Sequence, residues 1–221
     1  MRSSPSNRKH THLPHYGMIL FLFPFLVSCA PLNTKSAVIS TSLIEPSVVR
    51  GDARPDNFGL IGRVSVRDER QGFSGGIHWQ HTDTGDEILL LSPLGQTVAQ
   101  IQSSAAGASL TTPEKKTYYA ADIEHLTEQV LGWYLPLGGL QYWVQSMNSP
   151  TTRASLDRDS SGRVVAIWQD DWEITYTSYF PLGHSQIERP RVLVLNRGDL
   201  RIRLVIDQWK TDSPIQQIQF K

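Results

Sequence analysis

The sequence has very little cysteine: Cys29 is the single one among 221 residues. No disulfide can therefore form within the chain, and the fold must be held together by its hydrophobic core. An excess of one charge is also absent, since 21 basic residues balance 21 acidic ones and no basic run is present. A protein that neutralises nucleic-acid phosphates needs such a basic patch, so the composition excludes a nucleic-acid-binding protein.

A long hydrophobic run is absent as well. The longest apolar stretch, residues 16–27, contains Pro24 and is shorter than the about 20 residues that a transmembrane helix needs. Three basic residues and no acidic one precede it, and small residues end it, which is typical of a secretory signal peptide. We therefore predict that residues 1–28 are a signal peptide that is cleaved.

The sequence at the expected cleavage point, Leu26-Val27-Ser28-Cys29, resembles the lipobox of bacterial lipoproteins. This resemblance implies that the Cys29 thiol receives a diacylglycerol and that the new amino group is acylated. For a lone cysteine in an exported protein, a free thiol or an intermolecular disulfide is the alternative, but its place directly after the apolar run favours lipidation. Several acyl chains hold a protein stably in a bilayer, so Cys29 is expected to tether the chain to a membrane.

The mature chain divides by composition into a tether and a β-rich domain. Residues 29–57 are rich in Ser, Thr and Pro without clear periodicity, which indicates a linker. From Phe58 onward, short stretches alternate between apolar and polar residues, and turn residues separate them. Their short, even spacing favours antiparallel hairpins over crossover units, and we count about eleven strands in a domain of residues 58–221.

One segment breaks this β pattern. Asp122 can cap a helix, and apolar residues follow it at helical intervals as far as Leu131. The sequence 135–139 ends this helix, and a second short helix is indicated from Leu140 to Met147. Two amphipathic helices between strands must bury their apolar faces, and the sheet is the surface against which they can pack. We therefore predict a mainly β, strongly curved antiparallel sheet, open or barrel-like, with the helices on its concave face.

Residues that could catalyse a reaction or hold a metal do not come together in the sequence. Residues 72–76 match the G-x-S-x-G motif formally, but the chain continues as a strand instead of turning into a helix, so the glycines indicate a bulge or bend. Residues 157–162 resemble half of a calcium loop, but Trp168 stands where the closing glutamate belongs. The histidines lack the spacing of a zinc site. We predict no enzyme, no metal and no cofactor apart from the lipid on Cys29.

The residues that stand out are apolar. For any single tryptophan a place in the core is the simpler explanation, but a curved sheet can also keep a cavity for an apolar ligand. The sequence leaves a lined cavity and a filled interior both open, and we favour the cavity. Its predicted lining is Trp133, Leu135, Leu137, Leu140 and Trp143 from the helical segment, with Trp79, Leu89, Leu91 and Trp168 from the strands.

Leu94 is a large apolar residue within a predicted turn, Ser92-Pro93-Leu94-Gly95. Proline and glycine favour a tight turn, so the side chain between them is expected to project outward. Such a residue usually contacts a core edge, a membrane or a partner.

Several of these stretches occur in a familiar order. They are the lipobox, the strand from Phe58 to Arg63, the 91–95 turn, Tyr119-Ala120-Ala121-Asp122 and the two aromatic stretches 132–137 and 140–143. In this order they resemble the LolB family, the outer-membrane receptors of the lipoprotein-localisation pathway, over essentially the whole mature chain. The segment 184–189 is a departure that matches no pattern of the family.

The resemblance implies an incomplete, half-open antiparallel β-barrel with a helical lid over an apolar cavity. It implies a monomer, anchored in the outer membrane and facing the periplasm, that receives lipoprotein acyl chains from the periplasmic carrier LolA and inserts them into the outer membrane. It also implies that Leu94 acts in membrane insertion. Ala30 rather than Asp follows Cys29, which suits export to the outer membrane. A structural outer-membrane lipoprotein with a filled barrel remains the alternative.

Overall fold

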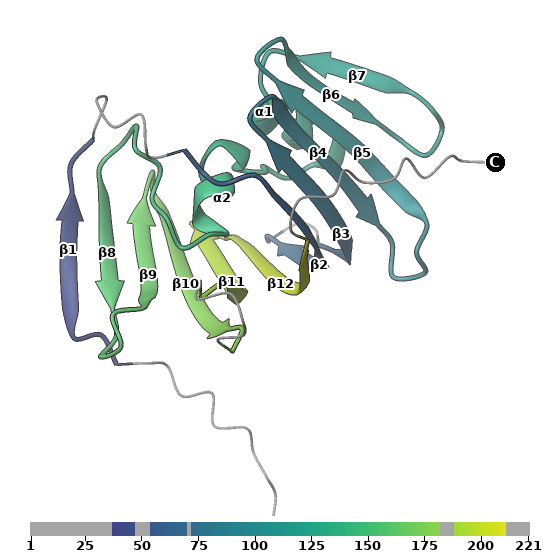
Figure 1. The fold of residues 1–221 in the computed structure, drawn as a ribbon. Coiled ribbons are helices and arrows are strands. Elements are labelled where there is room, and N and C mark those ends of the chain that lie inside the picture. The colour runs from purple at the N-terminus through teal and green to yellow at the C-terminus, as the bar shows by residue number, and fades with distance from the viewer. Residues whose placement is uncertain (1–36, 47–53, 70–71, 182–187, 211–221) are drawn as a thin grey trace, which may run out of the picture. The chain divides into compact units, whose positions relative to one another are not determined.

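The computed structural model describes residues 37–46, 54–69, 72–181 and 188–210 (Figure 1). These residues form one 12-stranded antiparallel sheet and two helices. The strands are β1 Ser40–Ile44, β2 Phe58–Arg67, β3 Gly72–Thr82, β4 Gly85–Leu91, β5 Thr97–Ser104, β6 Gly107–Thr111, β7 Thr117–Ala120, β8 Ala154–Arg158, β9 Val164–Gln169, β10 Trp172–Tyr179, β11 Pro190–Arg197 and β12 Leu200–Lys210. The helices are α1 Ile123–Leu131 and α2 Leu137–Trp143.

The sheet is open, because the strands at its two ends do not pair with each other. Its order is β1-β8-β9-β10-β11-β12-β2-β3-β4-β5-β6-β7. Each of the runs β2 to β7 and β8 to β12 is a meander of hairpins, as the even spacing of the turn signals predicted. The two meanders join in the sheet where β12 pairs with β2, for example through Leu204 opposite Val64. The fold class predicted from the sequence is thus confirmed, with twelve strands where about eleven were expected.

The additional strand, β1, lies within the stretch that the sequence indicated to be a tether. Ser40 to Ile44 pair with β8, from Ser40 opposite Arg158 to Ile44 opposite Ala154. The ordered sheet therefore begins before Phe58, the residue at which we placed the start of the domain. Four of the five β1 residues are exposed, which is why the sequence of this strand shows no alternation.

The core lies on one face of the sheet, which we call the inner face. On it, Val64 of β2, Ile77 of β3 and Leu204 of β12 share one cluster of buried side chains with residues of both helices, including Leu126 and Trp143. The opposite face, which we call the outer face, carries the alternate residues of each strand. Because successive side chains point to opposite faces, the register of the strands decides which residues can reach the helices.

Helix α1 begins and ends as the sequence predicted. The Asp122 carboxylate accepts a hydrogen bond from the His125 amide at its start, and Gly132 ends it in the left-handed conformation, with φ of 84°. The helix packs against β6 and β7. Helix α2 starts at Leu137, earlier than the expected Leu140, and the Pro136 carbonyl accepts hydrogen bonds from the Gly139 and Leu140 amides in this first turn. Among the described residues, neither helix is long and apolar enough to cross a membrane.

Candidate functional site

Helix α2 is fixed to the inner face by one buried glutamine, Gln169 of β9. Its side-chain oxygen accepts hydrogen bonds from the Trp143 indole N–H (3.0 Å) and the Ser149 amide (2.9 Å). Its amide nitrogen donates to the Ser149 carbonyl (2.8 Å) and to the Thr152 hydroxyl (2.9 Å). Gln169, Ser149 and Trp143 are all buried, so this network is shielded from water and holds the C-terminal end of α2 in one place.

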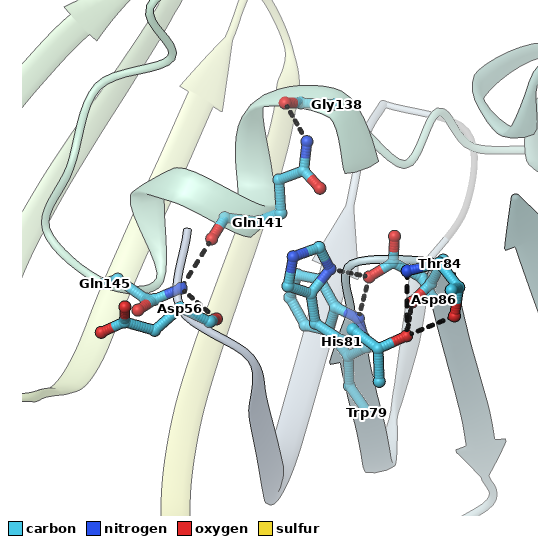
Figure 2. A network of polar contacts seen from close by, with 10 residues as sticks. Asp56, Trp79, His81, Thr84, Asp86, Gly138, Gln141 and Gln145 are labelled. Atoms are coloured by element: carbon cyan, nitrogen blue, oxygen red, sulfur yellow. Dashed lines mark hydrogen bonds and ion pairs between the residues drawn. The ribbon is translucent and has the colours of Figure 1, made fainter. Parts of the chain in front are cut away.

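A neighbouring tyrosine holds the same helix end. The Tyr176 hydroxyl of β10 donates to the Trp143 carbonyl at 2.7 Å, and the Trp143 and Trp172 rings lie 6.2 Å apart. Burial raises the pKa of Tyr176 well above its usual value, so the hydroxyl stays protonated and remains a donor. On the other side, the Gln145 side chain donates to the Asp56 carbonyl at 3.1 Å (Figure 2). Helix α2 is therefore a fixed part of the inner face.

Two hydrogen bonds link helix α1 to α2 and to the segment that leads into it. The Thr127 hydroxyl accepts a hydrogen bond from the Leu135 amide at 3.1 Å, and the Glu124 carboxylate accepts one from the Gly138 amide at 3.1 Å. Its most extensive contacts with the sheet are with β6 and β7, which form one end of it. Compared with α2, α1 thus rests on fewer buried polar contacts with the sheet.

An apolar cavity of about 190 Å³ lies between the C-terminal end of α1 and strands β3, β4 and β5. The Trp133 ring stacks on Phe73 across it, with ring centres 6.4 Å apart and an angle of 15° between the planes. The cavity is lined by Gly72, Phe73, Leu90, Val98, Leu131 and Trp133. It contains no charged lining residue, so a hydrocarbon chain is the kind of ligand that its surface suits.

Six of the nine predicted lining residues lie on the inner face with the helices. Trp133 lines the apolar cavity, and five others are buried in the core: Trp79, Leu135, Leu137, Leu140 and Trp143. Trp79 in particular is fully buried, and its indole N–H donates to Asp86, which also contacts His81 (Figure 2). The Trp79 ring packs edge-on against Phe58. The interior around these five residues is thus filled by their own side chains.

The other three predicted lining residues lie on the outer face, so their prediction was wrong. Leu89 and Leu91 alternate with the buried Ile88 and Leu90, and these two belong to the core. Trp168 is 46% exposed, because its neighbours Ile167 and Gln169 point inward. Both strands contain continuous apolar runs, which give no alternation from which the inward face could be chosen.

Sequence reasoning missed most of the cavity lining. Phe73, Leu90, Val98 and Leu131 were not among the predicted site residues, and neither was Gln169 behind α2. Phe73 and Leu90 could have been found by pairing the strands, because Phe73 and Ile77 share a face of β3, and Ile77 lies opposite Leu90. No signal in the sequence singled out Gln169, since a glutamine at the end of a strand is normally exposed.

The turn that carries Leu94 has the geometry that the sequence predicted. The Gly95 amide donates to the Ser92 carbonyl at 2.9 Å, which closes the turn, and Gly95 has φ of 79°. Leu94 is 88% exposed. The prediction that its side chain projects outward is therefore confirmed, whereas its role in membrane insertion stays a prediction.

The described residues contain no group of three or more His, Cys, Asp or Glu that could hold a metal ion. Asp159 lies in the turn between β8 and β9 and accepts hydrogen bonds from the Ser161 and Arg163 amides. Gly75, within the G-x-S-x-G match, lies opposite Val64 in a β2–β3 pairing that has no bulge, and the β3–β4 pairing begins at the next residue, Gly76. The Gly75 hydrogen faces the Leu91 carbonyl so closely that a Cβ would lie 1.9 Å from that oxygen.

Two predictions fall outside the described part of the chain. Cys29, with the predicted signal peptide, lies before residue 37, and most of the segment 184–189 lies in the gap between residues 181 and 188. Both stay predictions from the sequence.

Comparison with known proteins places this geometry in a family. Residues 56–209 match the family model described as outer membrane lipoprotein LolB. The chain is 41% identical over 195 residues to an outer-membrane lipoprotein LolB of Nitrosomonas europaea, covering 88% of this chain and 92% of that protein. It is 31% identical over 155 residues to one of Pseudomonas putida, covering 70% and 75%. A solved DUF1329 family protein from Desulfovibrio piger shares the fold with a TM-score of 0.50 at 7% identity, covering 73% of this chain and 87% of that one.

Proposed function

The chain belongs to the LolB family of outer-membrane lipoproteins and acts in lipoprotein localisation, and on that premise we propose how it does so. It receives lipoproteins from the periplasmic carrier LolA by binding their acyl chains next to Trp133, and it inserts them into the outer membrane through the Leu94 turn. No bond in the cargo is made or broken, so the protein is not an enzyme. The apolar cavity beside Trp133 is the single observation that carries this proposal.

The driving force for receipt is burial of hydrocarbon. Each buried methylene contributes about 0.8 kcal/mol, so an acyl chain brings on the order of 10 kcal/mol. The receptor must bind the chain better than the carrier does, but less well than a bilayer, since the cargo finally leaves for the membrane. The role then requires neither a nucleotide nor a metal.

The cavity must enlarge to take a whole chain. Its volume of about 190 Å³ is below the roughly 300–1,000 Å³ of common ligand pockets. Helix α2 is fixed by the Gln169 network, whereas Leu131 at the end of α1 borders the cavity and is only half-buried. We infer that α1 moves away from β3 to β5 when cargo binds, while α2 stays in place.

The test is the passage of a labelled lipoprotein from carrier to receptor and then to liposomes, with both steps measured. Leu131→Asp places a charge in the cavity lining, so it should reduce acceptance from the carrier by at least tenfold. Gln129→Asp introduces the same side chain two residues earlier on an exposed position of α1 and is the matched control. Equal acceptance by the two variants would refute binding at this cavity.

The second step is tested at Leu94. Leu94→Glu should accept cargo normally but release it poorly into liposomes, because a charge resists entry into the bilayer interface. Gln96→Glu, in the same exposed turn, should release cargo normally. If Leu94→Glu delivered cargo as well as this control, the Leu94 turn would have no part in insertion.

A further inference from the structure

Four arginines lie together on the outer face, where β2 pairs with β12. They are Arg63 and Arg67 of β2 with Arg201 and Arg203 of β12, and all four side chains are exposed. Arg67 lies directly opposite Arg201, and Arg203 lies opposite Ser65 between the two β2 arginines. We call these four residues the arginine patch.

The arginine patch is only partly neutralised. Arg63 pairs with Asp207 at 2.9 Å, and Arg201 donates to the neutral Asn196 side chain at 3.1 Å. Across residues 37–46, 54–69, 72–181 and 188–210, no ion pair involves Arg67 or Arg203. Of the four guanidinium groups, only that of Arg63 thus has a carboxylate in an ion pair among the described residues, which leaves the patch basic.

Stability does not account for this arrangement. Like charges directly opposite each other on neighbouring strands destabilise a sheet, and the Arg67–Arg201 pair is such a case. A sequence that breaks a local rule without a compensating contact commonly does so at a functional site. The compensation is then expected from a ligand that carries negative charge.

The rest of this row on the outer face shows where the basic surface ends. The strand register runs from Arg201 through Asn196 of β11 and Glu173 of β10 to Trp168 of β9, and then across β8 to Leu43 of β1. A carboxylate thus separates the arginine patch from the exposed side chains of Trp168 and Leu43. The basic surface is therefore confined to β2 and β12, and the β8 region does not belong to it.

The Leu94 turn lies at the same end of the sheet as the patch. Strand β4 ends at Leu91, opposite Gly76, and the chain continues past it toward the level of Gly72. Gly72 in turn lies opposite Arg67. Leu94 and the Arg67–Arg201 pair therefore lie at similar heights along the strands, so both can meet one membrane surface.

We propose that the arginine patch binds the anionic phospholipid headgroups of the outer membrane, so that the domain lies with the outer face of β2 and β12 against the bilayer while Leu94 enters it. This inference rests on the proposed delivery into that membrane. The neighbouring hairpin turns carry Asp68, Glu69 and Asp199. If the domain met the membrane with these turns alone, carboxylates would contact the anionic headgroups. If it meets the membrane with its outer face, the arginines contact them.

The first experiment measures contact without cargo or carrier. The mature lipid-anchored chain is reconstituted into phosphatidylethanolamine vesicles with or without phosphatidylglycerol, and the rate of arginine modification by phenylglyoxal is followed by mass spectrometry. Arg67 and Arg201 should be protected severalfold only when phosphatidylglycerol is present, and high salt should remove the protection, because salt screens exposed charges. Arg153 and Arg158 of the β8 region are internal controls whose rates should not change. The proposal would be overturned if anionic vesicles did not slow the modification of Arg67 and Arg201, or if they slowed that of Arg153 and Arg158 equally.

The second experiment uses matched variants. Each surface arginine near an anionic bilayer contributes roughly a fivefold factor in binding, so R67Q/R201Q should slow cargo release into phosphatidylglycerol vesicles by roughly tenfold or more. R153Q/R158Q has the same change in net charge and should have no effect. The thermal midpoint of R67Q/R201Q should not fall, since the like-charged pair is removed.

The outcomes separate this inference from the proposed function. If R67Q/R201Q impaired acceptance from the carrier instead of release, the patch would be a docking site for a protein, and the inference would be wrong. If cargo transfer failed altogether for the unmodified chain, the proposed function would be wrong, yet the protection of Arg67 and Arg201 by anionic vesicles would still be measurable.

Discussion

Replacing Gln169 by Leu is the most demanding test of how α2 is held. Leucine has nearly the same size but cannot form hydrogen bonds, so the Trp143 indole N–H and the Ser149 amide would lose their acceptor within the core. An unsatisfied buried donor costs about 1–3 kcal/mol. The two donors together predict a loss of about 2–6 kcal/mol, a large share of the roughly 5–15 kcal/mol that stabilises a typical domain.

The loss is measured by urea unfolding followed by tryptophan fluorescence. Gln208→Leu makes the same substitution at an exposed position of β12 and should change the free energy of unfolding by less than about 0.5 kcal/mol. A loss below about 1 kcal/mol for Gln169→Leu would refute the reasoning, because it would mean that water or another group replaces the lost acceptor.

A double-mutant cycle tests whether the Trp143 indole N–H is the donor that loses its acceptor in Gln169→Leu. Trp143→Phe removes the N–H donor, so adding Gln169→Leu to this variant should cost about 1–3 kcal/mol less than adding it to the unmodified chain. Strict additivity of the two losses would show that the two side chains do not depend on each other.

Two further predictions concern the interior strand β3 and the start of α1. Gly75→Ala should destabilise the domain and displace the end of β4, because the new Cβ would lie 1.9 Å from the Leu91 carbonyl oxygen. Thermal unfolding followed by circular dichroism would detect this, and a native midpoint would contradict it. The hydrogen bond with Asp122 raises the pKa of His125 above 6.5, so this contact stabilises the fold while His125 is protonated and is lost as the pH rises through the raised pKa. NMR titration of the His125 ring should show the raised value, and Asp122→Ala should bring it back to the ordinary one.

The sequence predicted those features that depend on local rules. Asp122 and Gly132 define a helix by capping, and the Pro93–Gly95 pair defines a turn, so α1 and the exposure of Leu94 followed from neighbouring residues alone. The antiparallel meander followed in the same way from the spacing of turns.

Features that depend on pairing across the sheet could not be predicted as well. The run Ile88-Leu89-Leu90-Leu91 is apolar at every position, so its inward face is decided by β3 and β5 and not by its own pattern. The same holds for Trp168 beside Ile167. β1 was missed because its partner β8 lies more than a hundred residues away in the chain, as the Thr41–Asp157 hydrogen bond illustrates with a separation of 116.

The pairing of β2 with β12 has a consequence for how the chain reaches its folded state. Arg63 and Asp207, which meet across this pair, are 144 residues apart, so the centre of the sheet closes a very long loop. Hairpins within each meander can form early, but contacts of such separation form late and slowly. When the chain is exported from its N-terminus, β12 is the last strand to arrive. Until β12 pairs with β2, the edge of β2 is unpaired and can bind another strand. The slow step of folding, and the period of greatest risk of misassembly, should therefore come at the very end of export.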